Sequence, residues 1–386
     1  MYTRVFLAVT LVLALLPRDL AAQKKKKSTS DDEGYIPQVL PDTKRKKQKE
    51  EETQTLPPAR ELPTAVVAET DRLAFDISPL TAKGLLSQQT REALKSLLKT
   101  NRGTIVKLRA FVAGSGDLRR VGELAAEMFA EKHQPPPVVS IVQVGGLPLI
   151  NAQVVIEATV VDKRAVNPNG IAFVSGQSAP SLAKSLDLLK TALRGANLEP
   201  NDALRVTCFV SSLDDEKSAH AMITSGFPGA VVNYVQMRRE PVTPAAECEA
   251  VARLKTAPPA SFVFANPPGL DKSPYYSHVA LVNSPRLVIT ATQLAFGTQE
   301  SDLKLAFERL GKALNSSNSR FGDVVMSHVY LSGSGMTDRI RTVRSQYYTG
   351  KNPPASTMLP FEGLPGLDAQ MGLDVISIAD STNAQR

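Results

Sequence analysis

Hydrophobic and polar residues follow two periods along residues 62–380, and the same succession of periods occurs three times. Three segments carry apolar residues at helical spacing, and each predicts a helix with one apolar face: Ser87–Lys99, Ser181–Arg194 and Glu300–Asn315. Each is followed by a segment that predicts a strand running into a loop rich in Gly, Ser and Asp: Ile105–Val112, Ala203–Val210 and Asp323–Leu331. Each unit is therefore predicted to contain a hairpin, a helix, a strand, a second helix and two final strands.

The end of each unit carries the strongest repeat signal. Residues 138–148 read VVSIVQVGGLP and residues 231–241 read VVNYVQMRREP, with five of eleven positions identical, and 356–365 read STMLPFEGLP. The turn prolines lie 241 − 148 = 93 and 365 − 241 = 124 residues apart, because the third unit includes an extra strand and loop near 262–270. This periodicity predicts three tandem repeats, at 62–162, 163–256 and 257–381.

The first 22 residues have the pattern of an export signal. Met1–Arg4 is short and basic, Val5–Leu16 is largely apolar, and small residues precede Gln23. Such an apolar run is shorter than the ~20 residues that span a bilayer. Lys24–Lys27 would resist translocation, so an uncleaved anchor is the alternative. We expect a signal peptide at 1–22, a periplasmic or extracellular location and no transmembrane span in the mature chain.

Residues 23–61 alternate blocks of positive and negative charge with prolines and contain few large apolar residues. Such a segment cannot bury enough surface to offset its ordering entropy, so it predicts a disordered charged linker. The alternative is a basic segment that touches anionic lipid or cell-wall polymer, although its acidic blocks weaken that attraction.

Composition excludes several functions. The 386 residues carry a net charge of +7; residues 1–22 contribute +1 and 23–61 contribute +2, which leaves 7 − 1 − 2 = +4 for the rest. This is too weak for a dedicated nucleic-acid surface, so no nucleic-acid partner is expected. The four histidines are scattered singly, and no motif indicates a metal or a cofactor. Cys208 and Cys248 are too few for a disulfide framework, and the sequence leaves their pairing open.

One run of motifs resembles a known family. Phe173-Val174-Ser175-Gly176-Gln177, a helix, a strand, a second helix, VQVxGLP and a final IEA strand are similar to the Rid (YjgF-type) imine and enamine deaminases. The resemblance implies an α+β, chorismate-mutase-like fold in which each mixed sheet has two helices on one face. Because family members assemble as trimers, three copies imply a monomeric single-chain pseudo-trimer with an inner β-barrel and ligand clefts between copies.

The resemblance also shows which chemistry has been lost. Family deaminases place an Arg nine residues before the turn proline, where it clamps the substrate carboxylate. The matching residues here are Val139, Val232 and Ser356, none of which can do so. The family's catalytic carboxylate lies two residues before the Glu of the IEA motif. Its counterparts are Val155, Glu247 and Gly372, so only the second copy retains it.

Further residues are expected at the clefts. Ser175 and Gln177 belong to the SGQ turn and are expected to preserve backbone geometry, and Tyr276 matches a tyrosine that faces the ligand in the family. Arg238 and Arg239 could reach a cleft mouth, but exposed turn cations are the favoured interpretation. Glu247 is either a retained catalytic carboxylate or an acid that lines the barrel.

Two functions follow from these residues. The first is an exported pseudo-trimer that binds a small metabolite or a partner through degenerate clefts, without catalysis. The second is an active deaminase of 2-iminopropanoate-type imines that uses one rebuilt cleft around Glu247, without a cofactor. Loss of the Arg clamp from every copy favours the first, because such a clamp contributes binding energy in the transition state. A scaffold without a ligand is a third possibility.

Overall fold

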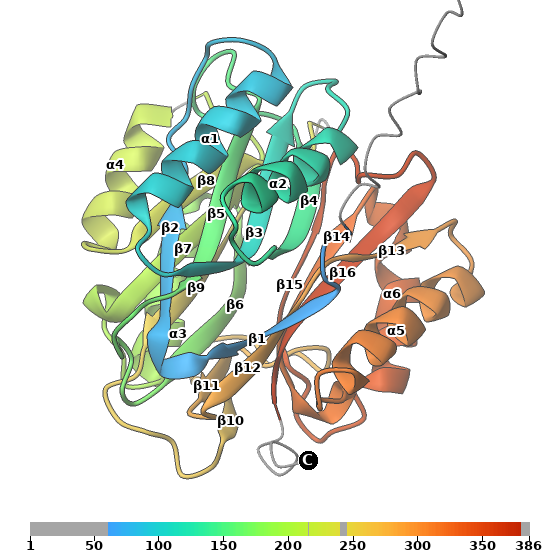
Figure 1. Ribbon diagram of the computed structural model, residues 1–386. Helices are drawn as coiled ribbons and strands as arrows, with labels where there is room; N and C mark the ends of the chain where they lie inside the picture. The colour runs from blue at the N-terminus through green and yellow to red at the C-terminus, as the bar shows by residue number, and fades with distance from the viewer. Residues whose placement is uncertain (1–60, 215, 240–244, 380–386) are drawn as a thin grey trace, which may run out of the picture. The chain divides into compact units, whose positions relative to one another are not determined.

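Three β-sheets, each covered on one face by two helices, make up the part of the chain that the computed structural model describes, residues 61–214, 216–239 and 245–379 (Figure 1). These residues all belong to one compact unit. The predicted signal peptide and, apart from Glu61, the predicted linker lie outside the described residues. Among the helices described, none has the length and apolar character needed to cross a membrane.

The first sheet has the strand order β2-β5-β3-β4. Its strands are β2 (Leu73–Ile77), β3 (Thr104–Ala113), β4 (Val138–Val144) and β5 (Val154–Val161), and its helices are α1 (Leu86–Thr100) and α2 (Arg119–Glu131). The apolar stripe of α1, which includes Leu94 and Leu97, packs with α2 residues such as Phe129 against this sheet. The structure thus confirms the helix predicted at Ser87–Lys99.

The second sheet has the order β10-β11-β6-β9-β7-β8. Its strands are β6 (Ile171–Ala179), β7 (Ala203–Val210), β8 (Val231–Gln236), β9 (Ala246–Arg253), β10 (Phe262–Ala265) and β11 (Val279–Val282), and its helices are α3 (Leu182–Gly195) and α4 (Glu216–Gly226). The Ser181 side chain caps α3 by accepting a hydrogen bond from the backbone N–H of Lys184. A short 3₁₀ turn at Pro200–Asp202 leads into β7.

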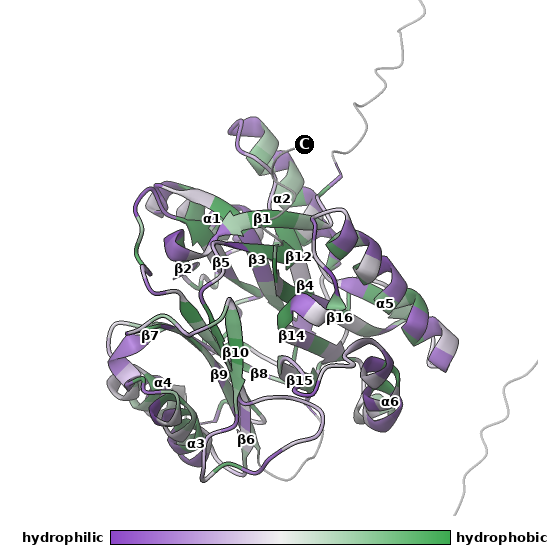
Figure 2. Cartoon of the chain, turned by 90° about the horizontal axis from the view of Figure 1, so that it is seen from below, coloured by the Kyte–Doolittle hydropathy of each residue, from purple (hydrophilic) through white to green (hydrophobic). Residues whose placement is uncertain are grey.

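The third sheet has the order β1-β12-β16-β14-β15, with β13 also paired to β16. Its strands are β1 (Ala65–Glu69), β12 (Arg286–Thr290), β13 (Gln293–Phe296), β14 (Val324–Leu331), β15 (Ala355–Pro360) and β16 (Ala369–Ile378), and its helices are α5 (Glu300–Asn315) and α6 (Thr337–Tyr347). Helix α5 begins and ends where the periodicity predicted. Figure 2 shows hydrophilic colour gathered on the helices and hydrophobic colour on the interior strands.

Four strands have the same order in every sheet. The series β2-β5-β3-β4, β6-β9-β7-β8 and β12-β16-β14-β15 each contain two antiparallel pairings followed by one parallel pairing. Phe111, Phe209 and Tyr330, which align in the sequence, meet in one apolar layer between the sheets. A second apolar layer, which includes Phe173 and Ile289, lies at the other end of the inner faces.

The hairpin predicted at the start of the first unit does not form, whereas β10 and β11 at the start of the third unit do pair antiparallel. β1 pairs with β12 of the third sheet and not with β2, and β11 pairs with β6 of the second sheet and not with β12. A 3₁₀ turn at Thr70–Arg72 separates β1 from β2, and the backbone N–H of Thr70 bonds to the Pro285 carbonyl. Edge strands are thus exchanged between sheets, since these short connections direct consecutive strands to different sheets.

The predicted inner barrel is not closed by strand pairing. The described strands form three separate sheets, and their edges are joined at isolated bridges such as Gln143–Gly363, Gly146–Gln236 and Ser277–Ala355. A closed barrel needs a continuous hydrogen-bonded ladder at every junction. Here neighbouring sheet edges share only a few backbone hydrogen bonds, such as those from Gln143 to Gly363 and from Gln236 to Gly146, so side-chain contacts must supplement them.

Cys208 and Cys248 form a disulfide, which resolves the pairing that the sequence left open. They are directly opposite each other on β7 and β9, with a Cα–Cα distance of 4.1 Å, and both are fully buried beneath the helices of the second sheet. The bond thus links neighbouring strands inside a single hydrophobic core.

We predict that replacing both Cys208 and Cys248 by Ala lowers the free energy of unfolding by about 2–4 kcal/mol, because the bond closes a long loop in the unfolded chain. Urea denaturation measures the loss. Denaturation of the wild-type protein in dithiothreitol should give a similar loss, whereas the double variant should not respond to the reductant. A wild-type midpoint that is the same with and without reductant would contradict the prediction.

Candidate functional site

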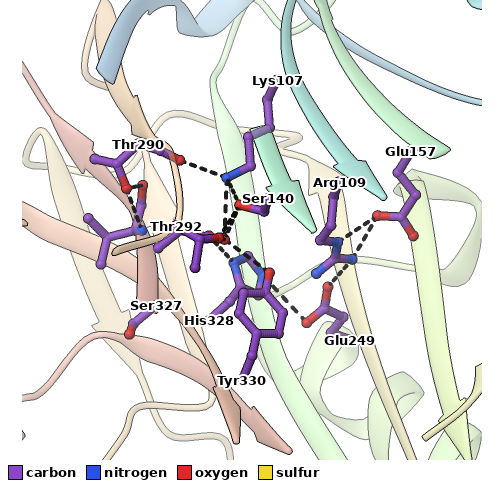
Figure 3. A network of polar contacts seen from close by, with 12 residues as sticks. Lys107, Arg109, Ser140, Glu157, Glu249, Thr290, Thr292, Ser327, His328 and Tyr330 are labelled. Atoms are coloured by element: carbon purple, nitrogen blue, oxygen red, sulfur yellow. Dashed lines mark hydrogen bonds and ion pairs between the residues drawn. The ribbon is translucent and has the colours of Figure 1, made fainter. Parts of the chain in front are cut away.

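A layer of charged and hydroxyl side chains fills the middle of the inner faces, between the two apolar layers (Figure 3). Successive residues of a strand point to opposite faces, so Lys107, Arg109 and Phe111 of β3 share the inner face. Each sheet also contributes an acid at the position of the IEA glutamate: Glu157, Glu249 and Asp374. The sequence did not predict that these residues form one network.

Arg109 joins the first sheet to the second. Its Nε donates a hydrogen bond to Glu157 Oε2 at 2.9 Å within the first sheet, and its Nη2 donates to Glu249 Oε1 at 2.7 Å in the second. Arg205 on β7 lies 3.6 Å from Glu157 and 3.5 Å from Glu249. Asn233 on β8 also donates to Glu157, at 2.8 Å. Two arginines and two glutamates thus bridge the junction between these sheets.

Asp374 of the third sheet contacts side chains of the first sheet. Lys107 Nζ lies 3.3 Å from Asp374 Oδ2 and donates to Ser140 Oγ at 2.7 Å, and Ser140 in turn donates to the same carboxylate at 2.6 Å. Tyr330 donates its hydroxyl to Asp374 at 3.0 Å. His328 lies 3.0 Å from Asp374 and 3.5 Å from Glu249, so it connects the third sheet to the second as well.

The pKa values follow from burial and pairing. Burial raises the pKa of Glu249, but Arg109 and His328 outweigh it, so the pKa of this carboxyl lies well below its usual range. Burial likewise opposes ionisation of Asp374, and Lys107 and His328 more than compensate, so its pKa is lowered too. Burial lowers the pKa of His328, but Glu249 and Asp374 raise it above the usual value.

This central network is densely packed, and its cations and carboxylates are paired with one another. Its most exposed ionic side chain, Lys107, is only 10% exposed, and the cavity beside it has a volume of about 30 Å³. Binding sites for organic ligands are typically about ten times larger. We therefore assign the network to holding the three sheets together and turn to the groups beside it that approach a sheet edge.

Glu247 lies on β9, two residues before Glu249, opposite Ser178 of β6. A Cβ atom at Gly176 would lie 1.9 Å from Glu247 Oε1, so glycine at 176 leaves the space that the carboxyl group occupies. Burial, followed by the negative charge of Glu249, raises the pKa of Glu247 to about 8. Glu247 is therefore mostly protonated at neutral pH, in contrast to its neighbour.

The β6–β15 seam, formed by Ser175–Gln177 of β6 and Ala355–Thr357 of β15, lies beside Glu247. The backbone N–H of Ser356 donates to Ser175 Oγ at 2.8 Å, and that of Gly176 donates to Thr357 Oγ1 at 3.0 Å. Ser175 Oγ donates to the Ser277 carbonyl at 2.6 Å. Gln177 donates to the Ser175 carbonyl at 2.9 Å, and both residues lie within β6, at an irregularity in its pairing with β9, and not in the turn that the sequence predicted.

Tyr276 is half-buried next to the seam, just before β11. Burial raises its pKa; the charges of Glu247 and Asp271 add to the increase, and Arg341 opposes it. Tyr276 therefore interacts electrostatically with both Glu247 and a cation of α6. Arg341 itself stacks over the ring of Tyr275, with its Cζ atom 4.9 Å from the ring centroid.

A guanidinium group also reaches the seam, from α6 and not from a strand. Arg344 is 3% exposed, and its Nη1 donates to Ser356 Oγ at 3.2 Å. Its Nε and Nη2 have no hydrogen-bond partner among the described residues, and burial lowers its pKa. Arg344 is not among the residues predicted from the sequence. The available signal was its spacing, because it lies four residues after Ile340, on the apolar stripe of the helix.

The structure brings together most of the residues predicted for a cleft. Ser175, Gln177, Glu247, Tyr276 and Ser356 gather at the β6–β15 seam. The other two predicted cleft residues, Val139 and Val232, lie at other junctions. The Val139 carbonyl accepts a hydrogen bond from the Thr292 N–H at 3.4 Å, and Val232 lies on β8, which contacts β2.

The two turn arginines contact neighbouring sheets. Arg238 Nη1 donates to the Ser332 carbonyl at 2.5 Å, and Arg239 Nε donates to the Gly145 carbonyl. Arg239 is exposed, as expected, and Arg238 is half-buried. These hydrogen bonds join the turn after β8 to the first and third sheets.

Within the described part of the chain, no group of three or more His, Cys, Asp or Glu side chains is arranged to hold a metal ion. The polar groups at the seam are a neutral carboxyl, a phenol, hydroxyls and a guanidinium. Together these groups suit an organic ligand that carries an anionic end and a hydrogen-bond acceptor.

Comparisons with known proteins agree with the resemblance over one segment. Residues 271–379 match the family model described as Endoribonuclease L-PSP, which supports the Rid (YjgF-type) family for one of the three expected copies. This segment contains β11–β16 together with α5 and α6. The comparison with curated proteins gave no significant match.

Similar solved structures include single members of that family. The Rid-family protein YyfB from Yersinia pestis is 18% identical over 31% of this chain and 99% of its own, with a TM-score of 0.29. Rv2704 from Mycobacterium tuberculosis, of the YjgF/YER057c/UK114 family, is 18% identical over 31% of this chain and 100% of its own, with a TM-score of 0.23. NMB1025 from Neisseria meningitidis, of the YjgF family, is 13% identical over 31% of this chain and 97% of its own, with a TM-score of 0.24.

We predict that Glu247→Gln stabilises the protein increasingly as the pH rises. The folded-state pKa of about 8 exceeds the ordinary 4.5, so the wild type loses stability from about pH 4.5 until pH 8 and the variant does not. By linkage, the difference in the free energy of unfolding between the variant and the wild type should change by about 3–5 kcal/mol across that pH range. Urea denaturation at several pH values measures it.

Glu308→Gln, at an exposed position of α5, is the matched control and should show no such trend. A stability difference between the wild type and Glu247→Gln that stays constant from pH 5 to pH 9 would contradict the raised pKa.

Proposed function

We propose that this chain is an exported Rid-type pseudo-trimer that binds a small carboxylate-bearing metabolite at the β6–β15 seam. The shared strand order of the three sheets supports three tandem copies at 62–162, 163–256 and 257–381. The meeting of Phe111, Phe209 and Tyr330 supports their equivalence around one axis. With its three copies on one chain, the protein is proposed to be a monomer.

Arg344 is the observation that carries the proposal. It is a buried guanidinium whose Cζ lies 5.4 Å from the centroid of the Tyr348 ring and whose Nε and Nη2 have no hydrogen-bond partner among the described residues. Leaving such donors unpaired costs roughly 1–3 kcal/mol or more. An anionic ligand would remove that cost. The contacts run from Arg344 to Ser356, from Ser356 to Ser175, and from neighbouring Gly176 to Glu247. The guanidinium and the neutral carboxyl group therefore belong to one seam.

Each group would have a definite role. Arg344 would pair with the ligand carboxylate. It would take the place of the arginine that family deaminases carry on a strand, at the position that Ser356 occupies here. Glu247, protonated at neutral pH, would donate a hydrogen bond to a carbonyl oxygen or imine nitrogen, and the Tyr276 hydroxyl would offer a second polar contact. A 2-oxo or 2-imino acid carries both required features on adjacent carbons.

The export proposal rests on the sequence of residues 1–22 and gains support from the Cys208–Cys248 disulfide. Disulfides persist mainly in oxidising compartments, whereas cytosolic thiols are kept reduced. The proposed location is therefore the periplasm or the extracellular space.

We predict that pyruvate binds with one site per chain and that Arg344→Gln weakens binding at least tenfold, since a hydrogen bond to a charged group contributes about 1.5–3 kcal/mol. Isothermal titration calorimetry gives the affinity and the stoichiometry. Arg339→Gln, on an exposed part of the same helix, should retain the wild-type affinity. Equal affinity in a folded Arg344→Gln protein would overturn the assignment, and melting temperatures recorded in parallel identify misfolding.

A second candidate function is imine or enamine deamination at the same seam. Its support is the raised pKa of Glu247, since a carboxyl group with a pKa near the working pH can both donate and accept a proton. Glu247 would protonate the imine nitrogen and then accept a proton from the water that adds to the carbon. Collapse of the adduct would release ammonia and leave the 2-oxo acid.

We predict that freshly generated 2-iminopropanoate separates the two functions. If the chain is a deaminase, ammonia release well above background disappears in Glu247→Ala, while Glu308→Ala retains it. Pyruvate binding without turnover would instead support a binding protein. Turnover that persists in Glu247→Ala would exclude Glu247 as the catalytic group.

A further inference from the structure

A second concave surface, remote from the β6–β15 seam in sequence, lies on the first sheet. A groove of about 690 Å³ is lined by the end of α1, the loop into β3, the end of α2, and residues next to β2 and β5. Six of its lining residues are cations, and none is acidic: Arg72, Lys95, Lys99, Arg102, Lys132 and Lys163. We call this surface the basic groove.

Most cations of the basic groove have no ion-pair partner in the part of the chain that the structure describes. Arg72 pairs with Glu69 at 3.3 Å, but the other five have no ion-pair partner within residues 61–214, 216–239 and 245–379. Elsewhere on the same two helices, Arg91 pairs with Glu127 and Arg120 pairs with Glu123. The lack of pairing therefore belongs to the groove and is not a general property of these helices.

Helix ends explain only part of this charge. Lys99 lies in the last turn of α1 and Lys132 caps the end of α2, where cations favour the helix dipole. Lys95, Arg102 and Lys163 lie outside the last turns of these helices, so the dipoles provide no reason for their convergence. Five like charges around one hollow repel one another, and that repulsion is relieved when an anion binds.

The floor and walls of the groove suit a bound anion. Phe129, Met128 and Val161 provide an apolar floor, and a one-sign cleft with low-dielectric walls concentrates the electric field. The loop that carries Arg102 is held in place, because Asn101 donates to Asp76 at 2.8 Å. A Cβ at Gly103 would lie 2.1 Å from the Val161 carbonyl oxygen, so this loop lies tightly against β5.

The second sheet covers its equivalent surface. There the segment after β10 packs on the end of α3, and a Cβ at Gly195 would lie 2.2 Å from Pro267. The first sheet ends at β2 and has no strands corresponding to β10 and β11, so the end of α1 stays open. The groove thus arises from the unequal distribution of edge strands among the sheets.

We propose that the basic groove binds a small multivalent phosphate anion. Several phosphate groups on one ligand can engage cations from α1, α2 and the two loops at once, whereas a monovalent anion engages fewer of them. Recognition by charge also predicts an affinity that falls steeply with salt concentration. This site is independent of the carboxylate site proposed at the β6–β15 seam.

Calorimetric titration of the full chain with inorganic tripolyphosphate in 150 mM NaCl tests the proposal. We expect one site per chain, and at least tenfold weaker binding in the triple variant Lys95→Gln, Arg102→Gln and Lys163→Gln. The control variant Lys184→Gln, Lys312→Gln and Lys351→Gln removes the same charge at exposed positions elsewhere and should bind within twofold of wild type. Orthophosphate should bind more weakly than tripolyphosphate to the wild type.

Three results would overturn the proposal: no binding by the wild type, equal loss in both triple variants, or equal retention in both. Equal loss would mean that net charge alone attracts the anion, and equal retention would assign binding to another segment such as Lys24–Lys27. Unchanged melting temperatures and pyruvate binding in the groove variant keep this result separate from the test of the β6–β15 seam.

Discussion

The ion pair between Arg109 and Glu249 is the contact on which the arrangement of the sheets depends most. The described strands of different sheets are joined only by isolated bridges and a few backbone hydrogen bonds, so side chains contribute much of the contact at their junctions. Arg109 contacts glutamates of two sheets at once and is almost completely buried. Removing charges from water costs several kcal/mol per ion, and only a close partner offsets that cost. Any shift of one sheet against another would leave a buried charge unpaired, so the pairs disfavour other arrangements.

The same network explains why two glutamates on one strand behave in opposite ways. Glu249 faces Arg109 and His328, and its pKa falls, whereas Glu247 lies beyond the reach of those cations and its pKa rises. The negative charge of Glu249 contributes to the rise. Burial is the larger cause of the raised pKa of Glu247, and the ionised carboxylate of Glu249 adds to it, so the central network contributes to the protonation state at the β6–β15 seam.

The three junctions differ at positions that correspond in the shared strand order. In the second sheet glycine at 176 makes room for Glu247, whereas in the third sheet Gly372 makes room for Thr292: a Cβ at 372 would lie 2.8 Å from the threonine methyl. In both sheets a glycine faces a larger side chain, but the glycine lies on β6 in the second sheet and on β16, the counterpart of β9, in the third. In the first sheet the corresponding residue is Val155, which belongs to the apolar layer around Phe111. Among the described residues, the β6–β15 seam combines a carboxyl group with a buried guanidinium from α6.

The sequence by itself determined the helices, the central strands and their repeated order. Segments such as Glu300–Asn315 and Ala203–Val210 match the structure residue for residue, because one-sided apolar periodicity is a local property of the chain. It also identified Glu247 and Tyr276, which lie within recognisable motifs. Tertiary structure decided the exchange of β1 and β11, the Cys208–Cys248 bond and the approach of Arg344 to Ser356. Each of these features joins segments that lie far apart in the sequence. Packing and burial select which segments meet, and no local sequence pattern encodes that choice.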